Sequence, residues 1–141
     1  AQNLLFTRQQ EKEHPCPYTS TLKAYLYEPN ASILKAGAFR SVSSIYNVEK
    51  LHPNSHLYTS DAYIPNFPGR KFRITGSSSL NKKGLKELIG TEKKANLTVR
   101  NFPTSVAELR KRLKLADGGD IYLFATTLAD EKKLLIACKQ P

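Results

Sequence analysis

The C-terminal half of the chain shows two kinds of hydrophobic pattern. Phe72 and Ile74 alternate with polar residues, as in a β-strand with one polar face. Leu109 and Leu113 are four residues apart, as on the apolar stripe of an amphipathic helix. Two other runs, residues 121–126 and 134–138, are apolar on both faces, which is typical of strands inside a sheet. The patterns predict strands at 71–75, 95–99, 121–126 and 133–138 and helices near 80–89 and 105–115.

The order strand, helix, strand, helix, strand, strand restricts the topology. A helix between two strands of one sheet joins parallel strands, and such crossovers are almost always right-handed. Two consecutive crossovers of the same hand place both helices on the same face of the sheet. The turn around Ala129-Asp130 makes the last two strands a hairpin. We therefore expect an α/β (α+β) fold, a two-layer sandwich in β-α-β-α-β-β order with a mixed four-stranded sheet.

The N-terminal half has a different pattern. Residues 24–27 are typical of an extended segment, and spaced apolar residues over 33–46 indicate two short helices. Prolines and a glycine at 65–69 mark a boundary. We expect a linker or strap over 1–23, where Pro15-Cys16-Pro17 forbids a helix, a small mainly helical subdomain over 24–68, and a basic α/β sandwich over 69–141.

The net charge of the 141-residue chain is +10, and the C-terminal half carries nearly all of it. Residues 1–69 hold six basic and five acidic side chains, whereas residues 70–141 hold sixteen and seven. One surface that meets a polyanion would produce this imbalance. A solvated surface that happens to be basic would produce it as well, so charge by itself leaves both explanations open.

Composition also argues against several classes of protein. No apolar stretch approaches the roughly 18 residues of a membrane span, so we expect no membrane partner. The sequence contains no methionine, which indicates a segment of a longer polypeptide. Cys16 and Cys138 are far apart, and His14, His52 and His56 do not complete a metal set with them. We expect no metal site, two free thiols and a cytoplasmic protein.

Three stretches resemble one family, in the same order. Residues 25–37 (YLYEPNASILKAG) resemble the "YLYEPD-x-x-VIRAG" segment of the THUMP-like domain that follows the catalytic domain in certain bacterial SAM-dependent methyltransferases. Residues 69–74 are similar to that family's "fxGRxFxV", and residues 97–100 with 108–115 resemble its "lTVKxRG…eLRkrLkL". The motif residues of the first stretch are Tyr27, Glu28, Pro29 and Gly37.

The resemblance implies a non-catalytic C-terminal domain of a class I methyltransferase that binds RNA substrate, either tRNA or rRNA. It also implies that residues 1–23 lead from an upstream catalytic domain of the same polypeptide, and that SAM binds there. The chain departs from the family at Asn101-Phe102-Pro103, where relatives often have a further basic residue and a glycine.

The residues themselves also predict no catalytic or cofactor site. The glycine pair Gly118-Gly119 follows a predicted helix, whereas a SAM site needs a glycine-rich turn after a strand. Phe72, Tyr122 and Phe124 fall on predicted strands and could stack on bases. Such alternating aromatic residues are more often part of a core.

Basic residues cluster on both predicted helices of the C-terminal half. Lys82, Lys83 and Lys86 lie on the exposed side of the first helix. If both helices cover one face, these lysines and the cations of the second helix flank a shared groove, with spacing that suits the phosphates of a folded RNA. The candidate RNA-binding residues are Arg70, Lys71, Arg73, Lys82, Lys83, Lys86, Arg100, Arg110, Lys111 and Lys114. Alternatively, the basic face docks on the catalytic domain and contacts no nucleic acid.

Overall fold

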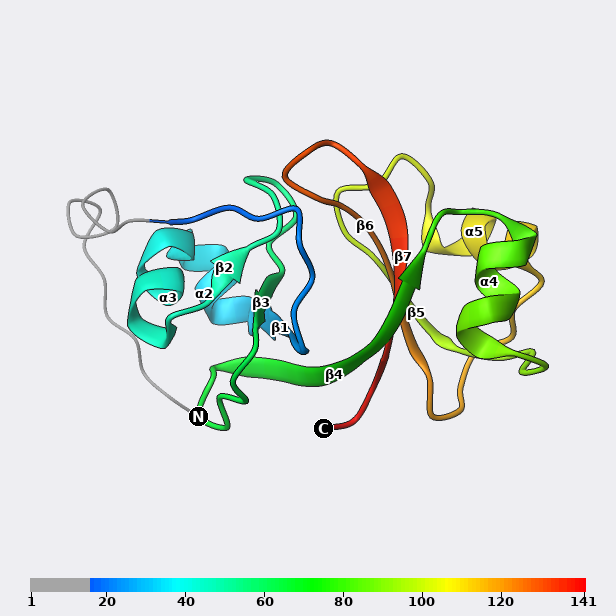
Figure 1. Ribbon diagram of the computed structural model, residues 1–141. Coiled ribbons are helices and arrows are strands. Elements are labelled where there is room, and N and C mark those ends of the chain that lie inside the picture. The colour runs from blue at the N-terminus through cyan, green and yellow to red at the C-terminus, as the bar shows by residue number, and fades with distance from the viewer. Residues whose placement is uncertain (1–15) are drawn as a thin grey trace.

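A computed structural model describes residues 16–141 (Figure 1). Its strands form one sheet in the order β2-β3-β1-β4-β7-β6-β5. The strands are β1 (Tyr25–Pro29), β2 (Glu49–Lys50), β3 (Tyr58–Ser60), β4 (Gly69–Ser78), β5 (Asn96–Val99), β6 (Tyr122–Thr127) and β7 (Lys133–Lys139). The helices are α2 (Ala31–Ala36), α3 (Phe39–Tyr46), α4 (Lys82–Ile89) and α5 (Val106–Leu113).

The C-terminal half has the predicted α/β topology. β5 and β6 are parallel, and β6 and β7 form an antiparallel hairpin. Leu85 of α4 and Leu109 of α5 belong to one buried cluster, together with Leu97, Leu123 and Leu135 of the sheet. Both helices therefore cover the same face of the sheet, as predicted, and Figure 1 shows them side by side at one end of the molecule.

The predicted number of strands was too low. We expected a four-stranded sheet, but β1, β2 and β3 of the N-terminal half extend it to seven strands. β4 makes this possible because its ten residues pair with β1 over 69–73 and with β7 over 73–78. β2 and β3 have only two and three residues, too few for an alternating pattern to be recognised in the sequence.

The two halves share a core. Along β1, Tyr27 packs with α2 and α3 in a cluster of the N-terminal half. Leu26 points to the other face of the strand and packs with Phe72 of β4 and Phe124 of β6. Phe72 and Phe124 are each 1% exposed, so these two aromatic side chains are core residues and do not offer a stacking surface.

Candidate nucleic-acid interface

Local sequence signals fix both ends of α4. Asn81 caps the N-terminus, since its side-chain oxygen accepts a hydrogen bond from the Gly84 N–H at 2.7 Å. Gly90, with φ 62°, ends the helix in a conformation that glycine adopts without strain. Leu85 and Ile89 are buried against the sheet. The lysines at 82, 83 and 86 are left on the exposed side.

α5 is positioned in a similar way. The Ser105 hydroxyl accepts a hydrogen bond from the Glu108 N–H at 3.2 Å, which is the predicted N-terminal cap. Lys114 adopts a left-handed conformation with φ 55°, and its N–H donates to the Arg110 and Lys111 carbonyls. This turn ends the helix and brings the chain to Leu115, which is buried beside α4 residues.

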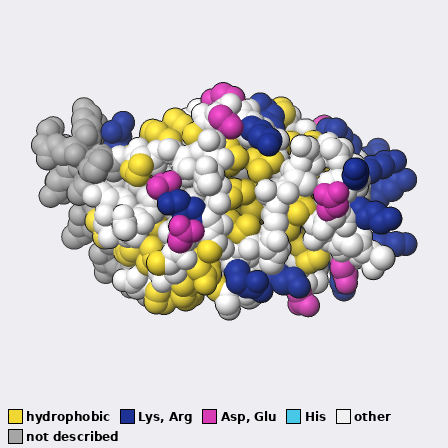
Figure 2. All heavy atoms as spheres, viewed as in Figure 1, with side chains coloured by type: hydrophobic (Ala, Val, Ile, Leu, Met, Phe, Trp, Pro, Cys, Tyr) yellow, Lys and Arg dark blue, Asp and Glu magenta, His cyan; other side chains and the backbone are white. Residues whose placement is uncertain are grey.

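A groove of about 550 Å³ lies between α4 and the C-terminal end of α5. We call it the α4–α5 groove. Its apolar lining consists of Leu85, Ile89, Leu113 and Leu115, its cations are Lys82, Lys86, Lys93, Arg112 and Lys114, and its acidic residue is Glu92. All five cations are exposed, and none forms an ion pair within residues 16–141. Figure 2 shows lysine and arginine side chains gathered at the end of the molecule that carries α4 and α5.

The groove brings together three of the ten predicted RNA-binding residues, namely Lys82, Lys86 and Lys114. Lys83 and Lys111 are exposed on the same helices but do not line the groove. Sequence reasoning missed Lys93 and Arg112, which do line it. The sequence shows two adjacent lysines, Lys93 and Lys94, but they lie in a loop between α4 and β5, and no periodic pattern predicts the path of a loop.

Arg110 has a different place from the one we expected. Its side chain is 22% exposed, and it donates hydrogen bonds to the Asp117 carboxylate at 2.9 Å and to the Ala95 carbonyl at 3.2 Å. Arg110 therefore holds α5 and the following turn against the chain that enters β5, and its charge is largely compensated.

Arg70 and Arg100 meet on one buried carboxylate. Arg70 contacts Oε1 of Glu28 at 2.8 Å, and Arg100 contacts Oε2 at 2.9 Å. The Glu28 side chain is 9% exposed, whereas the arginine side chains are 48% and 40% exposed. The Arg70 guanidinium also lies over the Phe72 ring, 5.2 Å from its centroid. Glu28, Arg70 and Arg100, which we call the Glu28 ion cluster, join the two halves and leave both arginines only partly available to a ligand.

Replacing Glu28 by glutamine is expected to lower the free energy of unfolding by about 2 kcal/mol. Glutamine keeps the size but removes the charge, so two arginines lose their counter-ion at a largely buried site. The loss in free energy of unfolding is not larger because both arginines remain partly exposed to water, which solvates their charges. Urea unfolding of E28Q and of E49Q provides the measurement and its control, since Glu49 pairs with Lys23 at a more exposed site. If E28Q lowered the free energy of unfolding no more than E49Q does, the cluster would have no special structural role.

The other motif residues also have structural roles. Tyr27 is fully buried, and its hydroxyl donates to the Ala62 carbonyl at 3.0 Å. Burial raises the pKa of Tyr27. Pro29 is the register partner of Gly69 at the end of the β1–β4 pair. Gly37 ends α2 with φ 68°. The motif behind the family resemblance thus builds the fold around β1.

Lys71 and Arg73 lie away from the α4–α5 groove. They belong to the part of β4 that pairs with β1, whereas α4 packs near Gly76 through Leu88. At about 3.3 Å per residue, Gly76 is on the order of 10–17 Å along the strand from these two residues. The predicted basic set is therefore divided between two regions of the surface.

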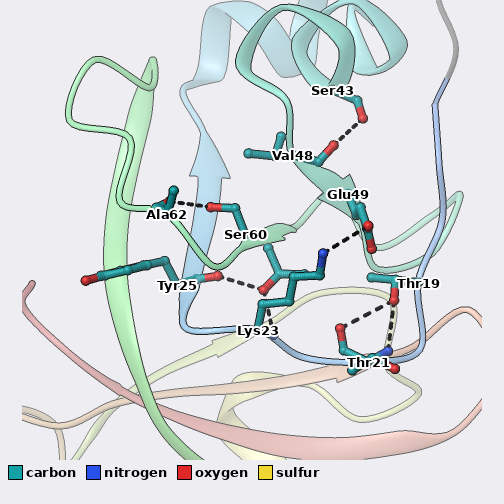
Figure 3. A network of polar contacts seen from close by, with 10 residues as sticks. Thr19, Thr21, Lys23, Tyr25, Ser43, Val48, Glu49, Ser60 and Ala62 are labelled. Atoms are coloured by element: carbon teal, nitrogen blue, oxygen red, sulfur yellow. Dashed lines mark hydrogen bonds and ion pairs between the residues drawn. The ribbon is translucent and has the colours of Figure 1, made fainter.

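Another hollow, of about 960 Å³, lies in the N-terminal half and is lined by Lys23, Ser43 and Glu49 among others. Lys23 forms an ion pair with Glu49 at 3.0 Å, and the Ser43 hydroxyl donates to the Val48 carbonyl (Figure 3). Because the lysine is paired with a carboxylate, this hollow offers little free positive charge to a polyanion.

Burial explains two strongly shifted side-chain pKa values, those of His56 and Cys138. Burial lowers the pKa of His56 to about 4, with Lys50 and Arg100 contributing, and its ring stacks on Phe39. Burial raises the pKa of Cys138 to about 12, so this free thiol is a poor nucleophile.

A metal site, a membrane span and a SAM site each require a distinct arrangement of residues. Within residues 16–141, no three histidine, cysteine, aspartate or glutamate side chains are close enough to hold a metal ion. No helix in the same range is long and apolar enough to cross a membrane. The Gly118-Gly119 pair follows α5 and precedes β6, so it does not form a turn after a strand of the kind that admits SAM.

The chain is similar to two known domain families and to one solved structure. Residues 69–140 match a family described as THUMP domain-like, and residues 25–68 match one described as a ferredoxin-like domain. The chain is 43% identical, with a TM-score of 0.88, to a crystal structure described as a "putative methyltransferase" from Porphyromonas gingivalis W83. The similarity covers 99% of this chain and 36% of that one, so this chain spans about a third of the relative. No curated protein matches the sequence.

Proposed function

The chain belongs to the THUMP domain-like family, and from this premise we propose that it is the RNA-binding part of a SAM-dependent methyltransferase. The similarity to part of a longer chain described as a "putative methyltransferase" supports this assignment. We propose tRNA or rRNA as the substrate, and the cytoplasm as the place where it is modified.

The observation that carries the proposal is the α4–α5 groove. Five exposed cations line this groove without a carboxylate partner among the described residues. Contacts to phosphates are the main source of affinity for nucleic acid, and cations at the rim of a groove can follow a curved backbone. With five cations and one carboxylate, that of Glu92, the groove is positively charged and therefore suits a folded RNA better than an uncharged ligand.

The chain itself would bind RNA and perform no chemistry. Its glycine pair does not fit a SAM site, because the pair follows a helix and is not at the end of a strand. We propose that SAM binds in another part of the same polypeptide, and that this domain presents the RNA to it.

RNA binding by the 141-residue chain tests the proposal. We expect binding of total tRNA, measured by fluorescence anisotropy, to weaken about 100-fold or more between roughly 50 and 200 mM salt. Five phosphate contacts would give such a slope, at about 0.7–0.9 released counterions per contact. If the folded chain binds no RNA even at low salt, the proposal is wrong. Docking of the groove on another part of the polypeptide would then explain its charge.

A further inference from the structure

A small hollow of about 330 Å³ lies where β4 begins and β7 ends. Its lining includes Tyr63 from the loop after β3, Lys71 and Phe72 of β4, and Tyr122 of β6. We call it the Tyr63–Tyr122 hollow. Its volume is at the lower end of the range of about 300–1,000 Å³ that is usual for sites of small ligands.

Two tyrosines of this hollow are held in place from one side and remain partly open. Tyr63 is 40% exposed and packs against Tyr25, with the ring centroids 5.2 Å apart. Tyr122 is half-buried, packs against Phe72 with centroids 4.9 Å apart, and accepts a hydrogen bond from the Gln140 amide at 3.0 Å. Aromatic rings fixed in this way lose little conformational entropy when a planar ligand stacks on them.

Cations without carboxylate partners accompany the two rings. Lys71 lines the hollow, and the acceptors near its ammonium group are the carbonyls of Phe67 and Gly69 at 3.5 and 3.4 Å. Arg73 is exposed two residues further along β4, opposite Lys139 of β7. No ion pair within residues 16–141 involves Lys71, Arg73 or Lys139.

We propose that the Tyr63–Tyr122 hollow binds an unpaired nucleotide of the RNA, with its base stacked on tyrosine and its phosphate near Lys71 and Arg73. The inference rests on the proposed function, because it requires RNA as the ligand. Aromatic rings beside cations are the usual means of holding single-stranded nucleic acid, whereas the bases of a duplex are stacked on one another and cannot enter.

The inference is tested by replacing Tyr63 with alanine in the 141-residue chain. Affinity for a short single-stranded RNA should fall about 5- to 100-fold, since stacking on one base contributes on the order of 1–3 kcal/mol. Affinity for a blunt RNA duplex should stay within about twofold of the parent, because a duplex contacts the protein through its phosphates. Fluorescence anisotropy with labelled oligonucleotides gives both affinities, and circular dichroism confirms that each variant is folded.

Two further variants make the test specific. Tyr63→Phe keeps the ring and should bind single strands like the parent. Tyr18→Ala removes another exposed tyrosine, 42% exposed, that does not line the hollow, and it should change neither affinity. If Y63A binds single strands like the parent, or if Y63F loses as much affinity as Y63A, the stacking proposal is wrong. The proposed function fails separately, if the parent chain binds neither RNA.

Discussion

Replacing Lys82, Lys86 and Lys114 together by alanine is expected to weaken RNA binding about 100-fold near 0.1 M salt. All three lysines line the α4–α5 groove and lack a carboxylate partner within residues 16–141. Removing three phosphate contacts should flatten the plot of log affinity against log salt concentration by about 2–3 units. The loss should be similar for RNAs of different sequence, because phosphate contacts carry little base information. Anisotropy titrations over a salt series measure both quantities.

A matched variant separates the groove from net charge. Three other exposed lysines lie outside the groove, namely Lys35, Lys132 and Lys133. Replacing them together by alanine removes three positive charges, as the groove variant does. We expect this control to lose only a few-fold in affinity, since exposed charges beyond about 10 Å are screened at 0.1 M salt. Equal losses in the two triple variants would show that RNA responds to overall charge, and the groove would no longer be the candidate site.

Replacing Gly69 by alanine is expected to cost about 3 kcal/mol or more of stability and to lower the melting temperature by about 10 °C. A Cβ atom at this position would lie 2.0 Å from the carbonyl oxygen of Glu28 and 2.9 Å from the backbone nitrogen of Asn30. All of these atoms belong to the backbone, so the strand pair β1–β4 would have to separate. Thermal unfolding followed by circular dichroism measures the loss.

Gly37 provides the comparison for this variant. It has φ 68°, and a Cβ atom added there would meet no atom within 4 Å, so Gly37→Ala introduces backbone strain without a clash. We expect a cost of about 1–2 kcal/mol for Gly37→Ala, which is clearly below that of Gly69→Ala. Similar losses at the two positions would mean that the close approach of β1 and β4 can relax.

Much of the C-terminal half could be predicted from its sequence, because its signals are local. Leu109 and Leu113 mark a helical stripe, and Ser105 with Glu108 marks its start. The alternation around Phe72 marks a strand. Both helices lie on one face, as expected, but not because both crossovers are right-handed. The chain moves from β4 across the sheet to β5 and then back to β6, so two right-handed crossovers would have placed the helices on opposite faces. The seven-stranded sheet could not be predicted, because the pairing of β1 with β4 joins residues forty or more positions apart and leaves no periodic pattern.

The candidate site shows the same division. Lys82 and Lys86 were predicted correctly to lie on the exposed face of α4, because helical periodicity determines which side of a helix is polar. Periodicity could not show that Arg110 is held by Asp117 and the Ala95 carbonyl, or that Arg100 reaches Glu28. Those partners lie in other elements of the structure. The acceptors within reach of a long side chain are therefore set by the fold and not by the neighbouring sequence.

The sequence by itself determined the α/β class, the helices and strands of the C-terminal half, the family and the concentration of positive charge after residue 69. Each of these depends on composition or on residues close together in the chain. The tertiary structure decided which cations are paired with carboxylates, and it placed Tyr63 and Tyr122, 59 positions apart in the sequence, in the lining of one hollow. Availability to a ligand depends on the burial and charge of neighbours in space, and only the folded chain brings those neighbours together.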